Sequence, residues 1–180
     1  MAIKKLGIGT VTQGEMQAQT AFSLITAILH IPNPMPPIQM LLIMGCYIHT
    51  NRNQMIEQAK REGCSHLLFV DTDVIFGPDA INKVIAADKD VVGGRYNKRT
   101  FPIVSTVPQD IKELAQVPFV PTGFLLINME VFEKIPSPWF GFDEETDSDD
   151  HYFCKKAIDA GYAIWCDPTI QIGHLGQAIF

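Results

Sequence analysis

The amino-acid sequence predicts an α/β fold in which helices cover both faces of a mostly parallel central sheet. Apolar runs of strand length alternate with stretches of helical periodicity through the first half of the chain. The run 38–44 is apolar except for Gln39, and the run 66–70 is apolar after His66, as parallel strands covered on both faces are. The second run ends abruptly at Asp71-Thr72-Asp73. The length of 180 residues suits one domain spanning 1–180.

The first elements follow from apolar spacing and from proline. A strand over 5–9 runs into a polar turn, and a helix follows over 18–29. Pro32 ends that helix, the proline-rich segment 32–37 forms a loop, and 38–44 is a strand. The apolar residues of the first helix recur every three or four positions and are expected to face the core; they are Ala18, Ala21, Phe22, Ile25, Ile28 and Leu29.

The middle of the chain continues the alternation. A helix is predicted over 51–62, a strand over 66–70, and a helix after Pro78 that carries Ile81, Val84 and Ile85 on one side. Another strand covers 90–93. The alternation favours parallel strands joined by right-handed crossovers.

The second half is less regular. Strands are predicted near 101–106, 117–120, 124–127 and 162–165. A helix is predicted over 148–160, with Thr146 and Asp149 as a capping box and Gly161 at its end.

Composition and charge exclude several classes of function. The net charge is −6, and no run of Lys and Arg could neutralise a phosphate backbone, so nucleic acid is not an expected partner. The N-terminus lacks the layout of a signal peptide, and no apolar stretch reaches the roughly 18 residues of a membrane span. Cys46, Cys64, Cys154 and Cys166 form no CxxC pair and are expected to be reduced core thiols of a cytoplasmic protein.

Asp71 and Asp73 are the first candidate site residues. They follow the clearest strand, and ligands of open α/β sheets gather beyond the carboxyl ends of strands. Two carboxylates this close repel unless a cation lies between them, and oxygen ligands suit Mg²⁺ or Mn²⁺. The alternative is that both carboxylates only cap the turn before Pro78.

His174 is the candidate third metal ligand. It lies between Gly173 and Gly176 within Gly-His-Leu-Gly, where backbone and ligand can approach closely. A structural role is the alternative reading of this single histidine. Among the other histidines, only His49, close to Arg52, is a further candidate for lining the site.

Asp149 and Asp150 close an acidic run, 143–150, and stand at the start of the predicted helix. A carboxylate fixed at a helix start suits a general base, although acidic residues are also favoured there by the helix dipole alone. Basic residues near the predicted strand ends are candidate counter-charges for a diphosphate, or solvated surface residues; they are Arg52, Arg95, Lys98 and Arg99.

Several of these segments together resemble GT-A glycosyltransferases, especially members similar to family 2. The resemblance covers residues 5–176 and rests on the order and spacing of the segments Leu67–Asp73, Val91–Tyr96, Thr122–Ile127, Asp149–Cys154, Ala160–Tyr162 and Gly173–His174. It implies a Rossmann-like three-layer sandwich. It also implies that Asp71, Asp73 and His174 hold Mn²⁺ or Mg²⁺ on the diphosphate of a nucleotide sugar.

The same resemblance implies roles for the remaining candidates. By position, Thr10 and Thr12 fit a nucleotide-contacting loop, and Arg52, Thr72 and Arg95 fit the donor site. Family members usually carry Glu-Asp where this chain has Asp149-Asp150, and this order assigns the base to Asp150.

The expected function is transfer of a sugar, with inversion, from a nucleotide-diphosphate sugar such as a UDP-sugar to an acceptor that the sequence does not identify. One alternative is a magnesium-dependent phosphohydrolase of the haloacid dehalogenase type. That family wants Thr or Val where this chain has Ile75, and places the motif near the start of the chain. A second alternative is a nucleotide-sugar-binding protein without catalysis.

Overall fold

The computed structural model describes residues 3–96 and 110–176. Their helices pack on a central sheet whose strand order is β2-β1-β3-β7-β5-β8-β4, with β6 paired to β8. The strands are β1 (Leu6–Thr12), β2 (Ile38–Met44), β3 (His66–Val70), β4 (Val74–Ile75), β5 (Val91–Tyr96), β6 (Ala115–Gln116), β7 (Phe124–Asn128) and β8 (Ile164–His174). The helices are α1 (Ala18–Leu29), α2 (Ile48–Arg61), α3 (Ala80–Ala86), α4 (Val131–Lys134) and α5 (Asp149–Asp159).

The sheet is mostly parallel, as the sequence predicts. β1 pairs in parallel with β2 and β3, and β5 pairs in parallel with β8. β7 lies between β3 and β5 and is antiparallel to both, so β1, β2, β3, β5 and β8 run in one direction. The short strands β4 and β6 are antiparallel to β8. This direction brings the carboxyl ends of β1, β3, β5 and β8 to one edge.

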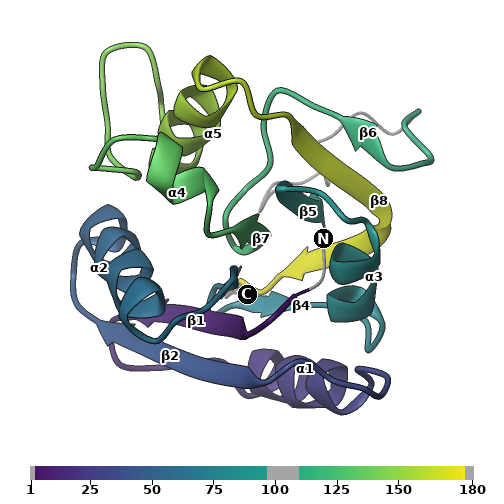
Figure 1. The fold of residues 1–180 in the computed structure, drawn as a ribbon. Coiled ribbons are helices and arrows are strands. Elements are labelled where there is room, and N and C mark those ends of the chain that lie inside the picture. The colour runs from purple at the N-terminus through teal and green to yellow at the C-terminus, as the bar shows by residue number, and fades with distance from the viewer. Residues whose placement is uncertain (1–2, 97–109, 177–180) are drawn as a thin grey trace, which may run out of the picture.

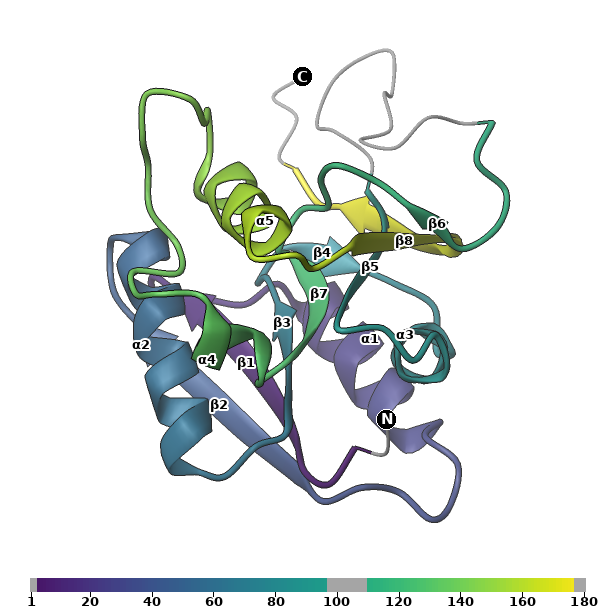
Figure 2. The same cartoon turned by 45° about the horizontal axis from the view of Figure 1, so that its top comes forward.

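Helices cover both faces of the sheet and make three layers. Figure 2 shows α2, α4 and α5 on one side of the strands and α1 and α3 on the other. On the first side, Met55 and Phe153 pack in one buried cluster with Leu67 and Phe69 of β3. On the second, Leu24 and Ile81 pack with Leu68 and Val70. All of β3 is therefore buried, because its alternating side chains enter two cores.

The predicted inward face of α1 is mostly wrong, although Ile28 does pack against the core. Phe22, Ile25 and Leu29 are exposed, whereas Thr20, Leu24 and Ala27 are buried against the sheet. The helix carries apolar residues on most of its circumference, so their spacing alone does not identify the buried face.

The strand 38–44 is confirmed, but only one of its faces is well covered. β2 is the outermost strand beside β1 (Figure 1), and Met40, Leu42 and Met44 are exposed while Leu41 is buried. An apolar run predicts a strand that is covered on both faces. Here α1 does not extend over the edge strand β2, so the face of β2 on that side stays exposed.

Other differences lie in the second half of the chain. Residues 117–120 form no strand; β6 covers Ala115–Gln116, and Val117 and Val120 are buried in the loop that follows. The strand expected at 162–165 begins at Ile164 and continues to His174. The segment 101–106 and the residues Lys98 and Arg99 lie outside the described residues.

Three smaller expectations are also corrected or completed. Ser148 caps α5 by accepting a hydrogen bond from the backbone N–H of His151, whereas Thr146 donates to Asp143. All four cysteines are free thiols, but Cys46 is exposed and is not a core residue. Among the described helices, none is long and apolar enough to cross a membrane.

Candidate functional site

The carboxyl ends of β3, β5 and β8 bring the predicted metal ligands to one edge of the sheet. Asp71 and Asp73 follow β3, and the chain then turns into β4. β4 pairs antiparallel with the end of β8, so that Val74 lies opposite His174. This pairing explains why a histidine about one hundred residues further along the chain lies beside the Asp71–Asp73 segment.

Asp73 and His174 are in contact. Nε2 of His174 lies 3.5 Å from Oδ1 of Asp73, and both side chains are partly exposed. The backbone N–H of Leu175 donates to the carbonyl of Asp73 at 2.7 Å, and the ring of Tyr96 packs edge-on against His174 at 5.4 Å between centroids. The imidazole and this carboxylate therefore point toward one another at the open edge.

Asp71 is turned toward a different partner. Nη2 of Arg52 lies 3.3 Å from its Oδ1, and its backbone N–H donates to the carbonyl of Gly123. Burial raises the pKa of Asp71 above its usual value, and the negative charges of Asp150 and Asp73 raise it further against the opposing effect of Arg52. This carboxylate is therefore stabilised only incompletely by the positive charge beside it.

Arg52 joins Asp71 to the acidic pair at the start of α5. Its Nη1 donates to Oδ2 of Asp149 at 2.7 Å and to Oδ1 of Asp150 at 2.6 Å. The guanidinium is almost fully buried and lies over the ring of Phe140, 5.5 Å from its centroid. Burial opposes its charge, but the nearby carboxylates raise the pKa of Arg52 above its usual value. The sequence predicts Arg52 at the donor phosphates. In the structure its guanidinium instead contacts the carboxylates of Asp71, Asp149 and Asp150.

The two carboxylates at the start of α5 differ in environment. The side chain of Asp149 is 10% exposed and that of Asp150 is 19% exposed. Burial, together with the charge of Asp150, raises the pKa of Asp149 against the effect of Arg52. Because the helix starts at Asp149, the two side chains diverge by about 100°, and Asp150 is the more accessible one.

A hollow of about 480 Å³ lies next to this cluster, at the carboxyl ends of β1 and β2. Thr12 and Thr72 line it, and Asn51 closes its floor by donating to the carbonyl of Gly45. A Cβ at Gly45 would lie 2.6 Å from Oδ1 of Asn51, so a larger residue here would displace the Asn51 side chain. Thr10 does not line the hollow; it is buried within β1.

Two other expectations concern Arg95 and the metal. Arg95, on β5, donates from Nη2 to the backbone carbonyl of Ile111, which ties its side chain to the loop before β6. Across residues 3–96 and 110–176, no three His, Cys, Asp or Glu side chains converge as a metal site. Asp73 and His174 are together, and Asp71 is held by Arg52.

Tyr96 and Gly123 are site residues to which the sequence reasoning gave no role. Tyr96 is buried, and a Cβ at Gly123 would lie 1.9 Å from its hydroxyl and 2.9 Å from Oδ2 of Asp71. Burial and the charges of Asp71 and Asp73 raise the pKa of Tyr96, so its phenol stays protonated. The sequence signals for them are their proximity to strand ends and their place in two of the segments that carry the GT-A resemblance, Val91–Tyr96 and Thr122–Ile127.

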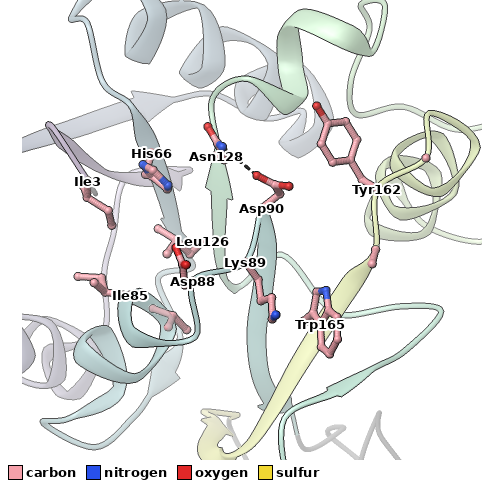
Figure 3. Close-up of a pocket in the computed structure, with 13 residues that line it drawn as sticks. Ile3, His66, Ile85, Asp88, Lys89, Asp90, Leu126, Asn128, Tyr162 and Trp165 are labelled. Carbon is pink, nitrogen blue, oxygen red and sulfur yellow. Dashed lines mark hydrogen bonds between the residues drawn. The ribbon is translucent and has the colours of Figure 1, made fainter. Parts of the chain in front are cut away.

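A second hollow, of about 330 Å³, lies at the opposite edge of the sheet (Figure 3). There Nδ2 of Asn128 donates to Oδ1 of Asp90 at 2.8 Å, and Nζ of Lys89 lies 4.4 Å from the ring centroid of Trp165. His66, at the beginning of β3, also lines it. Because this is the edge where β3 and β5 begin, it is not where ligands of such sheets gather.

The fold is the GT-A fold, which is also found in glycosyltransferases of known structure. The crystal structure of GalNAc-T7 with UDP, GalNAc and Mn²⁺ matches with a TM-score of 0.68 and 10% identity, over 97% of this chain and 44% of that one. S. aureus TarS 1–349 in complex with UDP matches with a TM-score of 0.63 and 16% identity, over 94% and 60% of the two chains. The chain thus spans about half the length of these two structures.

A third structure, A197 from STIV, is similar over most of its own length. It matches with a TM-score of 0.69 and 18% identity, over 95% of this chain and 86% of that one. No protein-family model and no curated protein matches the sequence. At these identities the comparisons show the fold, and the fold agrees with the one that the sequence predicts.

Proposed function

We propose that the protein transfers a sugar from a nucleotide-diphosphate sugar, with a UDP-sugar as the first donor to test, to an acceptor hydroxyl. The observation that carries this proposal is the placement of the Asp71–Asp73 segment between the hollow at β1 and β2 and the acidic start of α5. Donor and acceptor would thus meet at one strand edge, with carboxylates on either side. UDP in the TarS structure and UDP, GalNAc and Mn²⁺ in the GalNAc-T7 structure support the choice of donor.

Two residues at this edge are the proposed ligands of a divalent cation. Asp73 and His174 offer an oxygen and a nitrogen 3.5 Å apart on the partly exposed side, and Asp71 is a carboxylate that burial and its neighbours make costly to ionise. Mn²⁺ accepts such a mixed set of ligands. When bound, the cation would neutralise charge on the diphosphate as it departs. Asp73 and His174 would hold it, with Asp71 joining them.

Asp150 is the proposed base. The acceptor hydroxyl gives its proton to the Asp150 carboxylate, its oxygen bonds to the anomeric carbon, and the bond from that carbon to the diphosphate oxygen breaks. Arg52 holds Oδ1 of Asp150 at 2.6 Å, which orients the carboxylate and leaves its second oxygen for the acceptor. Asp149, more buried, completes the Arg52 contact.

The test is binding of UDP by isothermal titration calorimetry in Mn²⁺ and in EDTA. We expect binding in Mn²⁺ that is at least ~10-fold tighter than in EDTA, because the carboxylates otherwise repel the diphosphate. Asp73→Asn should lose this difference. Asp159→Asn, at the other end of α5 and exposed, is the matched control and should retain it.

Equal affinity with and without the cation would contradict the metal part of the proposal. Release of phosphate from a simple phosphomonoester, without any nucleotide sugar, would instead favour the phosphohydrolase alternative. Tight binding of UDP-sugars without turnover in the presence of glycan, lipid and small-molecule acceptors would favour a binding protein.

A further inference from the structure

An apolar surface lies on α1 and β2, and its Met44 end adjoins the hollow at the carboxyl ends of β1 and β2. Three side chains of α1 and three of β2 make it up, with exposed fractions between 51% and 78%; they are Phe22, Ile25, Leu29, Met40, Leu42 and Met44. We call it the α1–β2 surface. Single exposed apolar residues are ordinary, but six on adjoining elements are not.

The side chains of α1 lie on the flank of the helix that faces away from β4. Leu24 points into the core, and Ser23 and Ile25 stand about 100° to either side of it. Oγ of Ser23 accepts from the backbone N–H of Phe76, directly after β4, so this flank faces β4. The flank that carries Ile25 faces the opposite edge of the sheet, and Leu29 and Phe22 stand beside it, about 140° and 160° from Leu24. That edge is β2.

The side chains of β2 lie on the same face of the sheet as α1. Ile38 packs in the cluster that contains Leu24, and its face includes every second residue, Met40, Leu42 and Met44. Leu41 points to the other face and packs with α2. The exposed side chains of β2 and those of α1 therefore lie on the same face of the sheet and form one apolar surface.

The outer edge of β2 has the features of a pairing edge. Within the described residues β2 pairs with β1 alone. Monomeric proteins usually protect such an edge with charged residues, proline or a bulge, and 38–44 contains none of these in a regular seven-residue register. The backbone groups along this edge thus remain available for another strand.

The charge distribution decides what covers the surface. No Asp, Glu, Lys or Arg occurs from Met16 to Asn51, although the rest of the chain carries all fourteen basic and twenty acidic residues. An anionic membrane surface is bound through Lys and Arg beside the apolar face, and this region has none. A charged partner would bury unpaired charges here. A second copy of the same surface has a strand of matching pattern and no charge to bury.

We propose that the α1–β2 surface is the interface of a homodimer in which two β2 strands pair antiparallel about a two-fold axis perpendicular to the sheet. This symmetry keeps both α1 helices on one face, so each helix flank packs over the Met40–Met44 row of the partner strand. The six side chains expose about 700 Å² per copy if a fully exposed side chain of this size offers roughly 150–250 Å², which reaches the lower part of the range for stable interfaces.

The test is sedimentation velocity of the wild-type chain and three variants, in a reducing buffer because Cys46 is exposed. Leu42→Lys and Ile25→Lys each place a charge at an exposed position of the α1–β2 surface. Ile158→Lys, at an exposed apolar position of α5, is the matched control. Far-UV circular dichroism of all four proteins checks that the fold is unchanged.

We expect the wild type and Ile158→Lys to sediment as dimers on dilution from about 50 µM to about 1 µM, and both variants of the α1–β2 surface to raise the dissociation constant at least ~10-fold. A monomeric wild type at the highest concentration overturns the proposal, and so does a dimer that either of these two variants leaves intact. A monomer that floats with neutral phosphatidylcholine vesicles would assign the surface to lipid instead. None of these outcomes depends on binding of UDP.

Discussion

Nη1 of Arg52 lies 2.6 Å from Oδ1 of Asp150, which makes the buried guanidinium the direct support of the proposed base. The same nitrogen contacts Asp149, and Nη2 contacts Asp71. One positive charge therefore pairs with the carboxylate that follows β3 and with the two that begin α5. The position of each carboxylate depends on this charge.

Removal of Arg52 is expected to destabilise the fold strongly. Arg52→Met leaves Asp71, Asp149 and Asp150 without their shared counter-charge, and breaking a buried ion pair from one side costs about 3–5 kcal/mol. Arg52→Lys keeps the charge but loses the planar fork, so we expect a smaller loss, about 1–3 kcal/mol. Urea denaturation measures both values.

The control for this experiment lies on the same helix. Arg61 is exposed at the end of α2, and Arg61→Met should change the free energy of unfolding by less than ~0.5 kcal/mol. If Arg52→Met is as stable as the wild type, the carboxylates do not require the guanidinium. A double variant, Arg52→Met with Asp149→Asn, should recover part of the loss because one uncompensated charge is removed.

The proposed base is tested by exchanging each carboxylate of the pair for an amide. Asp150→Asn should lower the release of UDP from a UDP-sugar at least ~100-fold, because general-base catalysis typically contributes 10²–10⁴. Its affinity for UDP should stay within about twofold, since a base contributes to the transition state and not to donor binding. The readout is coupled detection of UDP across a panel of UDP-sugars.

Asp149→Asn is the matched comparison for Asp150→Asn. Both changes remove one carboxylate from Arg52, so a purely structural effect would be similar for the two variants. The assignment must be exchanged if Asp149→Asn alone loses turnover. If neither variant loses it, the base lies elsewhere or the reaction retains configuration.

The close approach of Gly123 to Tyr96 gives a prediction for a position without catalytic function. Gly123→Ala places a methyl group 1.9 Å from the Tyr96 hydroxyl and 2.9 Å from Oδ2 of Asp71, so a neighbour must shift. We expect a loss of about 1–3 kcal/mol, as for other overpacked sites. Tyr96→Phe in the same chain should recover part of the loss, because it removes the nearest atom.

A double-mutant cycle by urea denaturation measures this coupling. We expect about 0.5–3 kcal/mol between the two positions. Gly141→Ala is the control, because its Cβ would meet Tyr152 only at 3.4 Å, an ordinary contact distance. Additive effects of Gly123→Ala and Tyr96→Phe would contradict the close approach.

Much of the sheet could be predicted from the sequence because buried strands and their polar ends are local signals. β3 and the turn at Asp71 were expected where they occur, and the boundaries of β2 agree. The start of α5 at Asp149 was also expected within one residue. The antiparallel insertion of β7 carries no such signal, because strand direction depends on long-range pairing.

The candidate site was only partly predictable, for a related reason. Sequence position brings Arg52 near a strand end, but whether its guanidinium faces solvent or the carboxylates depends on the burial of α2. The pairing of β4 with β8, which brings His174 to Asp73, links residues one hundred positions apart. The exposed flank of α1 shows the same limit, since its stripe is no less apolar than the buried one.

His66 lies at the start of β3, away from the proposed chemistry, and its protonation is coupled to the stability of the fold. Burial lowers the pKa of His66 below its ordinary value of 6.5, against the effect of Asp90 and Glu130. The unfolded chain therefore binds a proton at a higher pH than the folded chain does. Stability is fully present above about pH 6.5 and falls as the pH drops toward the folded-state pKa, by at most about 1.4 kcal/mol per pH unit.

His66→Gln should remove this dependence, because the variant has nothing to protonate at that position. The measurement is the free energy of unfolding in urea from about pH 7.5 to about pH 5, taken as the difference between wild type and variant so that the site carboxylates cancel. The difference should shift steadily against the wild type as the pH falls. A difference between wild type and His66→Gln that stays constant with pH would show that folding does not lower the pKa of His66.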